Sequence, residues 1–316
     1  MKDFQIIKRV LFEILFISIP FILASSLLVV RAMDESVEKS IAQQNIRTYN
    51  DAYEIKPYPI FDSSQISGIS AYAAIIVDDA SQVVIFAKNP RFRFSMASTT
   101  KLMSALIGLD YFAKDDILTV RRVGVEGAVV GFPLGEKLFF DDLLYAMLLP
   151  SGNDATYAIA DSYPGGVGSF ITAMKTKARE LHLNETNFSD PAGLSDSGYT
   201  TVSDLARMTS FVIKNPIIAR ITGTKQKNIT NVDGSRKYLL SNLNKLLGSN
   251  GVVGVKTGYT QEAGEVLITA KVDDGHTYII VVMNSKDRFL DTQKLLFWLS
   301  DNIQFFSPHF KSLDLK

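Results

Sequence analysis

The order of strand and helix patterns along the chain limits the folds that it can adopt. Apolar runs typical of strands lie within residues 71–87, and others lie within residues 252–284. The stretch between them, residues 98–213, carries apolar residues at helical spacing. Early and late strands that join one antiparallel sheet, flanked by helices and with an inserted helical lobe, satisfy this order. We therefore expect such an α/β (α+β) fold in residues 69–306.

The first thirty residues carry a separate pattern. Basic residues precede an apolar stretch, residues 10–30, in which Glu13 is the only charged residue. This length is sufficient for one tilted membrane helix, and the preceding positive charges place the rest of the chain outside the cytoplasm. We expect a cytoplasmic segment at 1–9 and an uncleaved single-pass signal anchor at 10–30 in the cell membrane. Secretion after cleavage of a signal peptide is the alternative.

The segments on either side of the expected domain have no strong pattern. Residues 31–68 are polar, lack a sustained strand pattern and are expected to form an extracytoplasmic tether. A final helix is expected from about Leu290 to Phe305, followed by a short tail at residues 307–316.

The composition excludes several classes of function. The chain has no cysteine, so disulfides, thiolate nucleophiles and thiolate metal sites are excluded. Its 33 Lys and Arg residues balance 33 Asp and Glu residues, and there is no sustained basic run. We therefore expect no nucleic acid partner.

A lysine begins the apolar helix predicted at residues 102–109. This residue, Lys101, lies three positions after Ser98, and residues at that spacing share one face of a helix. Burying an ammonium group is costly unless it is paired or loses its charge. One interpretation is that Lys101 extends to solvent; the other is that it deprotonates Ser98. A helix start also supplies backbone N–H groups that could stabilise an oxyanion near the serine.

Two short motifs follow at larger distances along the chain. Ser151-Gly152-Asn153 comes directly after a predicted helix and by itself indicates a turn. Lys256-Thr257-Gly258 lies on a predicted strand. Lys and Thr side chains on an edge strand, beside a glycine that allows close approach, suit an extended ligand with a carboxylate.

Together, Ser-x-x-Lys, Ser-x-Asn and Lys-Thr-Gly in this order resemble the active site of penicillin-binding proteins and serine β-lactamases. The wider stretches are similar to the low-molecular-weight D-alanyl-D-alanine carboxypeptidases: ASTTKLMSAL, DDLLYAMLLPSGNDA, ETNFSDPAGL, SNLNKLL and GVKTGYTQEAGE. The resemblance implies the penicillin-binding protein and β-lactamase-like transpeptidase fold, without a metal or other cofactor. It also implies removal of the terminal D-alanine from peptidoglycan stem peptides that end in D-Ala-D-Ala, and covalent binding of β-lactam inhibitors.

The resemblance assigns catalytic roles to three residues. Ser98 would be the nucleophile that attacks the penultimate D-alanine carbonyl, and Lys101 would be its general base. Ser151 would relay a proton to the amine of the leaving D-alanine.

It also assigns substrate-binding residues. Asn153 would bind the substrate amide and hold Lys101, and Lys256 would keep the site positive. The terminal carboxylate would be bound by Thr257, which precedes Gly258, and by Arg288. The backbone N–H groups of Ser98 and Tyr259 would form the oxyanion hole.

Three other functions remain open. A peptidoglycan D,D-endopeptidase would use the same residues. A serine β-lactamase is possible because Glu180 to Asn184 spell Glu-x-x-Leu-Asn, which supplies the deacylating glutamate in one class of these enzymes; we expect instead that Glu180 ends a helix. A degenerate module that only binds peptidoglycan is disfavoured by the presence of both Ser98 and Lys101.

Overall fold

The computed structural model describes residues 31–40, 58–61 and 66–306. The chain divides into two compact units, Met1–Lys56 and Pro57–Lys316. In the first unit, residues 31–40 are helical. The expected membrane segment at 10–30 lies outside the described residues. None of the helices in the described ranges combines the length and the apolar character that crossing a membrane requires.

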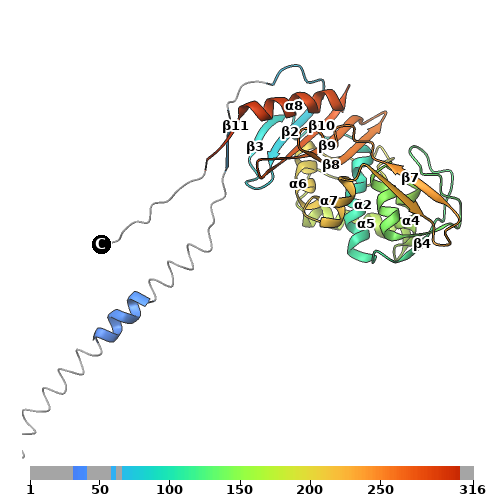
Figure 1. Cartoon of the computed structure of the whole chain (residues 1–316), viewed down its shortest axis with the longest axis horizontal. Helices are drawn as coiled ribbons and strands as arrows, with labels where there is room; N and C mark the ends of the chain where they lie inside the picture. The colour runs from blue at the N-terminus through green and yellow to red at the C-terminus, as the bar shows by residue number, and fades with distance from the viewer. Residues whose placement is uncertain (1–30, 41–57, 62–65, 307–316) are drawn as a thin grey trace, which may run out of the picture. The chain divides into compact units, whose positions relative to one another are not determined.

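The core of the second unit is a five-stranded antiparallel sheet (Figure 1). Its strands, given in their order across the sheet, are β3 (Val84–Lys88), β2 (Ala73–Asp78), β10 (His276–Ser285), β9 (Gly264–Asp273) and β8 (Val252–Thr260). Early and late segments of the chain therefore join in one sheet, as the sequence predicted. The Lys-Thr-Gly strand β8 lies at one edge of this sheet.

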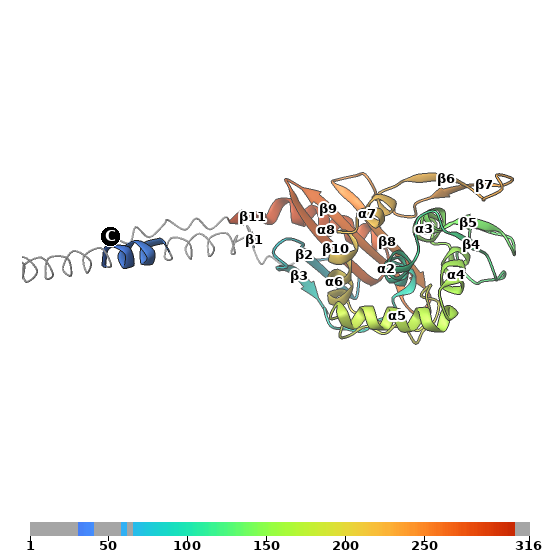
Figure 2. The same cartoon turned by 90° about the horizontal axis from the view of Figure 1, so that it is seen from below.

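Helices cover both faces of the sheet. They are the 3₁₀ turn η1 (Ala97–Thr100), α2 (Lys101–Tyr111), α3 (Phe140–Leu148), α4 (Asn153–Ser162), α5 (Gly166–Glu180), α6 (Val202–Val212), α7 (Pro216–Thr222) and α8 (Arg288–Asn302). Two small antiparallel hairpins belong to the inserted lobe: β4 (Ile117–Thr119) with β5 (Lys137–Phe139), and β6 (Gln226–Thr230) with β7 (Lys237–Ser241). Figure 2 shows this lobe beyond β8, with α2 between it and the sheet.

The alternation of side chains along a strand explains the two layers. All six residues of β2 are buried, because successive side chains point to opposite faces that are both covered. Ile75 and Val77 belong to the large hydrophobic cluster formed with α2 to α7. Ala74 and Ile76 belong to a second cluster, which contains the buried leucines of α8. Figure 1 shows α8 on one side of the sheet and α6 and α7 on the other.

The chain after α8 differs from the sequence prediction. The expected helix to Phe305 ends at Asn302, and Ile303–Phe306 form a strand, β11. This strand pairs with β1 (Tyr58–Phe61), which lies in the segment expected to be a tether. The physical reason is aromatic packing: the rings of Tyr58 and Phe306 lie 5.6 Å apart, and Phe305 stacks on His276. Such pairing between distant segments leaves no local pattern in the sequence.

One buried carboxylate ties the first turn of α8 to two strands. Asp291 is 1% exposed and accepts hydrogen bonds from the Ser70 N–H (2.8 Å), the Ala71 N–H (2.6 Å) and the hydroxyls of Ser70 (2.7 Å) and Ser285 (2.5 Å). Burial alone would raise the pKa of Asp291, but the hydrogen bonds from Ser285, Ser70 and Ala71 outweigh it, so the pKa is lowered. The residues just before β2, the end of β10 and the start of α8 therefore meet at this side chain.

We predict that Asp291→Asn lowers the free energy of unfolding by about 3 kcal/mol, because an amide NH2 would face donors that now bind Oδ2. The lowered pKa means that this stabilisation is present above about pH 4 and is lost as the pH falls through the folded-state pKa. Denaturant unfolding at neutral and acidic pH measures both effects. Asp233→Asn, at an exposed carboxylate that binds the Ser235 N–H, is the control. Equal stability of Asp291→Asn and this control would contradict the prediction.

Candidate active site

Ser98 and Lys101 lie where the 3₁₀ turn η1 passes into α2. The Nζ of Lys101 donates hydrogen bonds to the Ser98 Oγ at 3.0 Å and to the Ala192 carbonyl at 2.8 Å. Lys101 has no solvent exposure, so the interpretation in which it extends to solvent is wrong. Burial lowers the pKa of Lys101 to about 7, although the carboxylates of Asp190 and Asp154 act in the opposite direction. Near neutral pH the amine therefore exists in both protonation states.

A second pair of a lysine and a serine lies in the same site. Ser151 lies in the turn between α3 and α4 and has a positive φ of 66°. The Nζ of Lys256, on β8, donates hydrogen bonds to the Ser151 Oγ at 3.0 Å and to the Thr257 carbonyl at 3.1 Å. Burial lowers the pKa of Lys256 well below its ordinary value, and the positive charges of Lys101 and Arg288 add to the effect.

Asn153 begins α4 but does not hold Lys101 as expected. Its Nδ2 donates a hydrogen bond to the Glu126 carbonyl at 2.6 Å, and its N–H donates one to the Ala128 carbonyl at 2.7 Å. Lys101 instead binds Ser98 and Ala192. The buried Oδ1 of Asn153 has no hydrogen-bond partner among the described residues. It is thus a buried acceptor left without a donor.

The edge strand β8 runs directly beside the 3₁₀ turn η1, which contains Ser98. A Cβ at Gly258 would lie 3.2 Å from the Ala97 Cβ and 3.4 Å from the Ser98 nitrogen. A side chain at this position would therefore be tightly placed against η1, whereas the sequence argument expected the glycine to allow close approach of a ligand. Thr257 is buried, whereas Tyr259 is 64% exposed.

Arg288 joins the site from the first residue of α8. Its Nη1 donates a hydrogen bond to the Gly258 carbonyl at 2.7 Å, and its backbone N–H donates one to the Glu265 Oε2 at 2.8 Å. Its buried Nε has no partner among the described residues. Burial lowers the pKa of Arg288, but a guanidinium remains charged at neutral pH. The Arg288 guanidinium therefore lies against the Lys-Thr-Gly strand β8 and is, after Lys101 and Lys256, the third basic group of the site.

The loop at residues 190–195 is part of the site, and sequence reasoning missed its role. It supplies the Ala192 carbonyl that binds Lys101. Gly193 has a φ of +79°, and a Cβ there would lie 1.8 Å from the Ala97 carbonyl oxygen. Ala97 itself has a φ of +46°, a conformation that is unusual for a residue with a side chain. The available signals were the family-like stretch ETNFSDPAGL, which was given no role, and the glycine after Asp-Pro-Ala, which indicates a turn rather than a contact with Ala97.

Glu180, the feature that a serine β-lactamase would use, ends α5 as expected. Its carboxylate pairs with Lys177 at 3.3 Å, and Lys177 also pairs with Asp110 at 2.8 Å. Both carboxylates are more than half exposed. These contacts link the surfaces of α2 and α5, and none of them involves Ser98.

Comparison with known proteins identifies the family. A family model described as D-alanyl-D-alanine carboxypeptidase, peptidase family S11, matches residues 61–287. The chain belongs to this family. It is 32% identical over 240 residues to the D-alanyl-D-alanine carboxypeptidase DacF of Bacillus subtilis, covering 72% of this chain and 61% of that protein. The chain therefore spans less than two thirds of that relative.

Two further relatives are matched over a larger share of their own length. A D-alanyl-D-alanine endopeptidase of Escherichia coli is 30% identical over 240 residues, covering 73% of this chain and 77% of that protein. The crystal structure of the Streptomyces K15 DD-transpeptidase superimposes with a TM-score of 0.70 at 30% identity, covering 73% of this chain and 97% of that one. These similarities confirm the penicillin-binding protein fold and the family that the three motifs indicated.

We predict that Gly193→Ala disrupts the site. A Cβ at this position would overlap the Ala97 carbonyl, and alanine would also have to adopt a positive φ. We expect the free energy of unfolding to fall by about 3 kcal/mol or more, and any folded protein to react slowly with penicillin.

The matched control for this variant is Gly234→Ala. Gly234 has a similar φ of +75°, but a Cβ there would meet nothing within 4 Å. It should therefore lose about 1–2 kcal/mol for the backbone conformation alone and keep its reactivity. Denaturant unfolding and the rate of penicillin acylation measure both outcomes, and equal losses in the two variants would contradict the role of the Ala97 contact.

Proposed function

We propose that this protein is a serine-type D-Ala-D-Ala carboxypeptidase that trims peptidoglycan stem peptides. The observation that carries the proposal is the pair of buried lysines with lowered pKa, each 3.0 Å from a serine hydroxyl. A lysine that is neutral near pH 7 can take the proton of a serine, which an ordinary surface lysine cannot do. Membership of the D-alanyl-D-alanine carboxypeptidase family supports the same reaction.

In the proposed acylation, the Ser98 Oγ attacks the carbonyl carbon of the penultimate D-alanine, and its proton passes to the neutral Nζ of Lys101. The peptide C–N bond then breaks as Ser151, which Lys256 Nζ contacts, relays the proton: its hydroxyl protonates the leaving D-alanine amine and regains the proton that Lys101 had accepted, so Lys101 is neutral again. Water hydrolyses the resulting ester and releases the shortened peptide and Ser98. The transfer from Ser98 to Lys101 uses a hydrogen bond of 3.0 Å that already exists in the free protein, and a second one of 3.0 Å from Lys256 holds the Ser151 hydroxyl.

Charge and backbone geometry support the assignment of the substrate-binding residues. The terminal carboxylate of the peptide would lie against Thr257, with Lys256 and Arg288 as nearby cations. The free Oδ1 of Asn153 would accept the substrate amide N–H. The N–H groups of Ser98 and Tyr259 would bind the oxyanion, which fits the close approach of β8 to the Ser98 nitrogen.

A D,D-endopeptidase that cuts peptide cross-links is the second candidate. The observation that favours it is the 30% identity to the Escherichia coli protein named as an endopeptidase. The same residues would act, but the acceptor side of the cleaved bond would have to accommodate a longer peptide. The serine β-lactamase alternative lacks comparable support, because the partners of Glu180 lie on the surface of α2 and α5.

We predict that the purified protein releases D-alanine from a diacetylated tripeptide ending in D-Ala-D-Ala, and that Ser98→Ala reduces this release more than about 1,000-fold. Ser300→Ala, at an exposed serine of α8, should retain full activity. Free D-alanine and the intact mass after penicillin treatment are the measurements. Cleavage of cross-linked dimers without release of terminal D-alanine would favour the endopeptidase. A folded protein that reacts with neither substrate nor penicillin would contradict both.

We also propose that residues 10–30 anchor the protein in the cell membrane, with residues 31 onward outside the cytoplasm. The support is the apolar stretch, in which Glu13 is the only charged residue, and the basic residues before it. The full chain should then sediment with membranes and resist carbonate extraction, whereas a variant that begins at residue 31 should be soluble. The mass of the mature protein distinguishes the alternative: loss of about the first thirty residues would show a cleaved signal peptide.

A further inference from the structure

One side chain closes the loop that contacts Lys101. Asp190 accepts hydrogen bonds at Oδ1 from three successive backbone N–H groups, those of Ala192 (2.7 Å), Gly193 (2.7 Å) and Leu194 (3.1 Å). Its Oδ2 accepts a fourth from the Ser195 N–H at 2.8 Å. A carboxylate that accepts four backbone hydrogen bonds fixes the path of the loop residue by residue.

The loop folded in this way presents two carbonyl groups to α2. The Ala192 carbonyl accepts a hydrogen bond from the Lys101 Nζ at 2.8 Å, and the Pro191 carbonyl accepts one from the Ser104 Oγ at 2.5 Å. Within the part of the chain that the structure describes, Lys101 Nζ hydrogen-bonds this carbonyl and Ser98. The orientation of the amine toward Ser98 thus depends on the position of Ala192.

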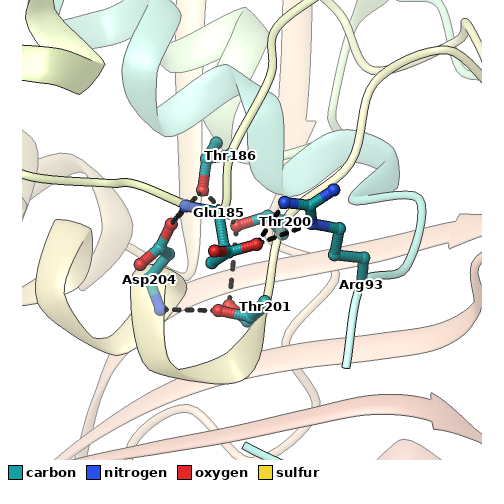
Figure 3. A network of polar contacts seen from close by, with 6 residues as sticks. All are labelled: Arg93, Glu185, Thr186, Thr200, Thr201 and Asp204. Carbon is teal, nitrogen blue, oxygen red and sulfur yellow. Dashed lines mark hydrogen bonds and ion pairs between the residues drawn. The ribbon is translucent and has the colours of Figure 1, made fainter. Parts of the chain in front are cut away.

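A separate polar network holds the ends of the same loop (Figure 3). Asp204, near the start of α6, accepts hydrogen bonds from the Glu185 N–H at 2.8 Å and the Thr186 hydroxyl at 2.7 Å. The Thr186 and Thr200 hydroxyls lie 2.8 Å apart, and Phe94 and Thr200 exchange two backbone hydrogen bonds of 2.9 Å. The loop is therefore attached to the segment that leads to Ser98.

The charged groups around Lys101 act in opposite directions. The carboxylates of Asp190 and Asp154 favour its ammonium form, whereas burial favours the neutral amine. Lys256, on β8, is the neighbouring amine, and the charge of Lys101 lowers the pKa of Lys256. Asp190 differs from Asp154 in that its loop also touches the Lys101 nitrogen.

We infer that Asp190 is a positioning residue for the general base: its carboxylate holds the Ala192 carbonyl on the Lys101 Nζ and places a negative charge near that nitrogen. This inference rests on the proposed function, in which neutral Lys101 accepts the Ser98 proton. It has two separable consequences. Loosening the loop reduces the rate at every pH, and removing the charge changes the pH at which the rate falls.

The test uses the full chain in detergent and the rate of acylation by benzylpenicillin, followed by intact mass from pH 5 to 9. In the wild type the rate should fall below about pH 7, where Lys101 becomes protonated. Asp190→Asn should lower the high-pH plateau about tenfold, because the amide cannot accept the Ser195 N–H while binding the other three. The acid limb of its pH profile, where the rate falls as the pH decreases, should lie at lower pH than that of the wild type. The reason is that the amide, unlike the carboxylate, does not favour the ammonium form of Lys101.

Asp204→Asn is the matched control, because it loosens the ends of the loop without removing a carboxylate that acts on Lys101. Its acid limb should coincide with that of the wild type, whatever its thermal stability. Should Asp190→Asn fail to fold, Asp190→Glu keeps the charge but displaces the carboxylate, and its plateau should fall with an unchanged acid limb.

A folded Asp190→Asn with the wild-type plateau and acid limb would overturn the inference, as would a wild-type plateau in Asp190→Glu. Failure of the proposed function gives a different result. In that case the wild type itself would not be acylated at Ser98, and Ser98→Ala would behave like the wild type.

Discussion

Burial of two lysine side chains in one site is the constraint on which the rest of this structure depends. Lys101 is fully buried and Lys256 nearly so, and each lies close enough to the other for their charges to interact. Burial disfavours the ammonium forms of both lysines, and the charge of Lys101 further disfavours that of Lys256. The lowered pKa values favour the neutral amines, which are less costly to bury than ammonium groups. The amines also donate hydrogen bonds to the backbone carbonyls of Ala192 and Thr257. For Lys101, whose pKa is lowered to about 7, burial makes the amine able to accept a proton near neutral pH.

The carboxylates nearest to Lys101 do not neutralise it, because backbone groups occupy their oxygens. Asp190 accepts four N–H groups of its own loop, and Asp154 accepts the N–H groups of residues 130–132 and 155. Neither makes an ion pair with Lys101 in the described part of the chain. A direct ion pair would hold the lysine in its charged form and remove the base. Because both carboxylates are committed to the backbone, Lys101 stays titratable near pH 7.

The sequence predicted the central sheet and the motif residues because both depend on local patterns. Apolar runs of four to nine residues mark the buried strands, and the spacing from Ser98 to Lys101 places both on one face of a helix turn. What the sequence did not predict depends on pairing over long distances. The strand β1 exists because Ile303–Phe306 pairs with it, and the Ala192 carbonyl has no side chain that could identify it. Resemblance to a family placed Arg288 in the site, which spacing alone could not do.

The first turn of α8 shows that stability and chemistry share one element of this fold. Arg288 begins this helix and reaches the Gly258 carbonyl, and Asp291 in the same turn binds the residues just before β2 and the end of β10. Asp287 caps the turn by accepting the N–H groups of residues 289 and 290. The position of the arginine is thus fixed by the same contacts that fix the helix against the sheet. A change that loosened this turn would move a cation of the site as well as weaken the core, so the two effects at this position are physically inseparable.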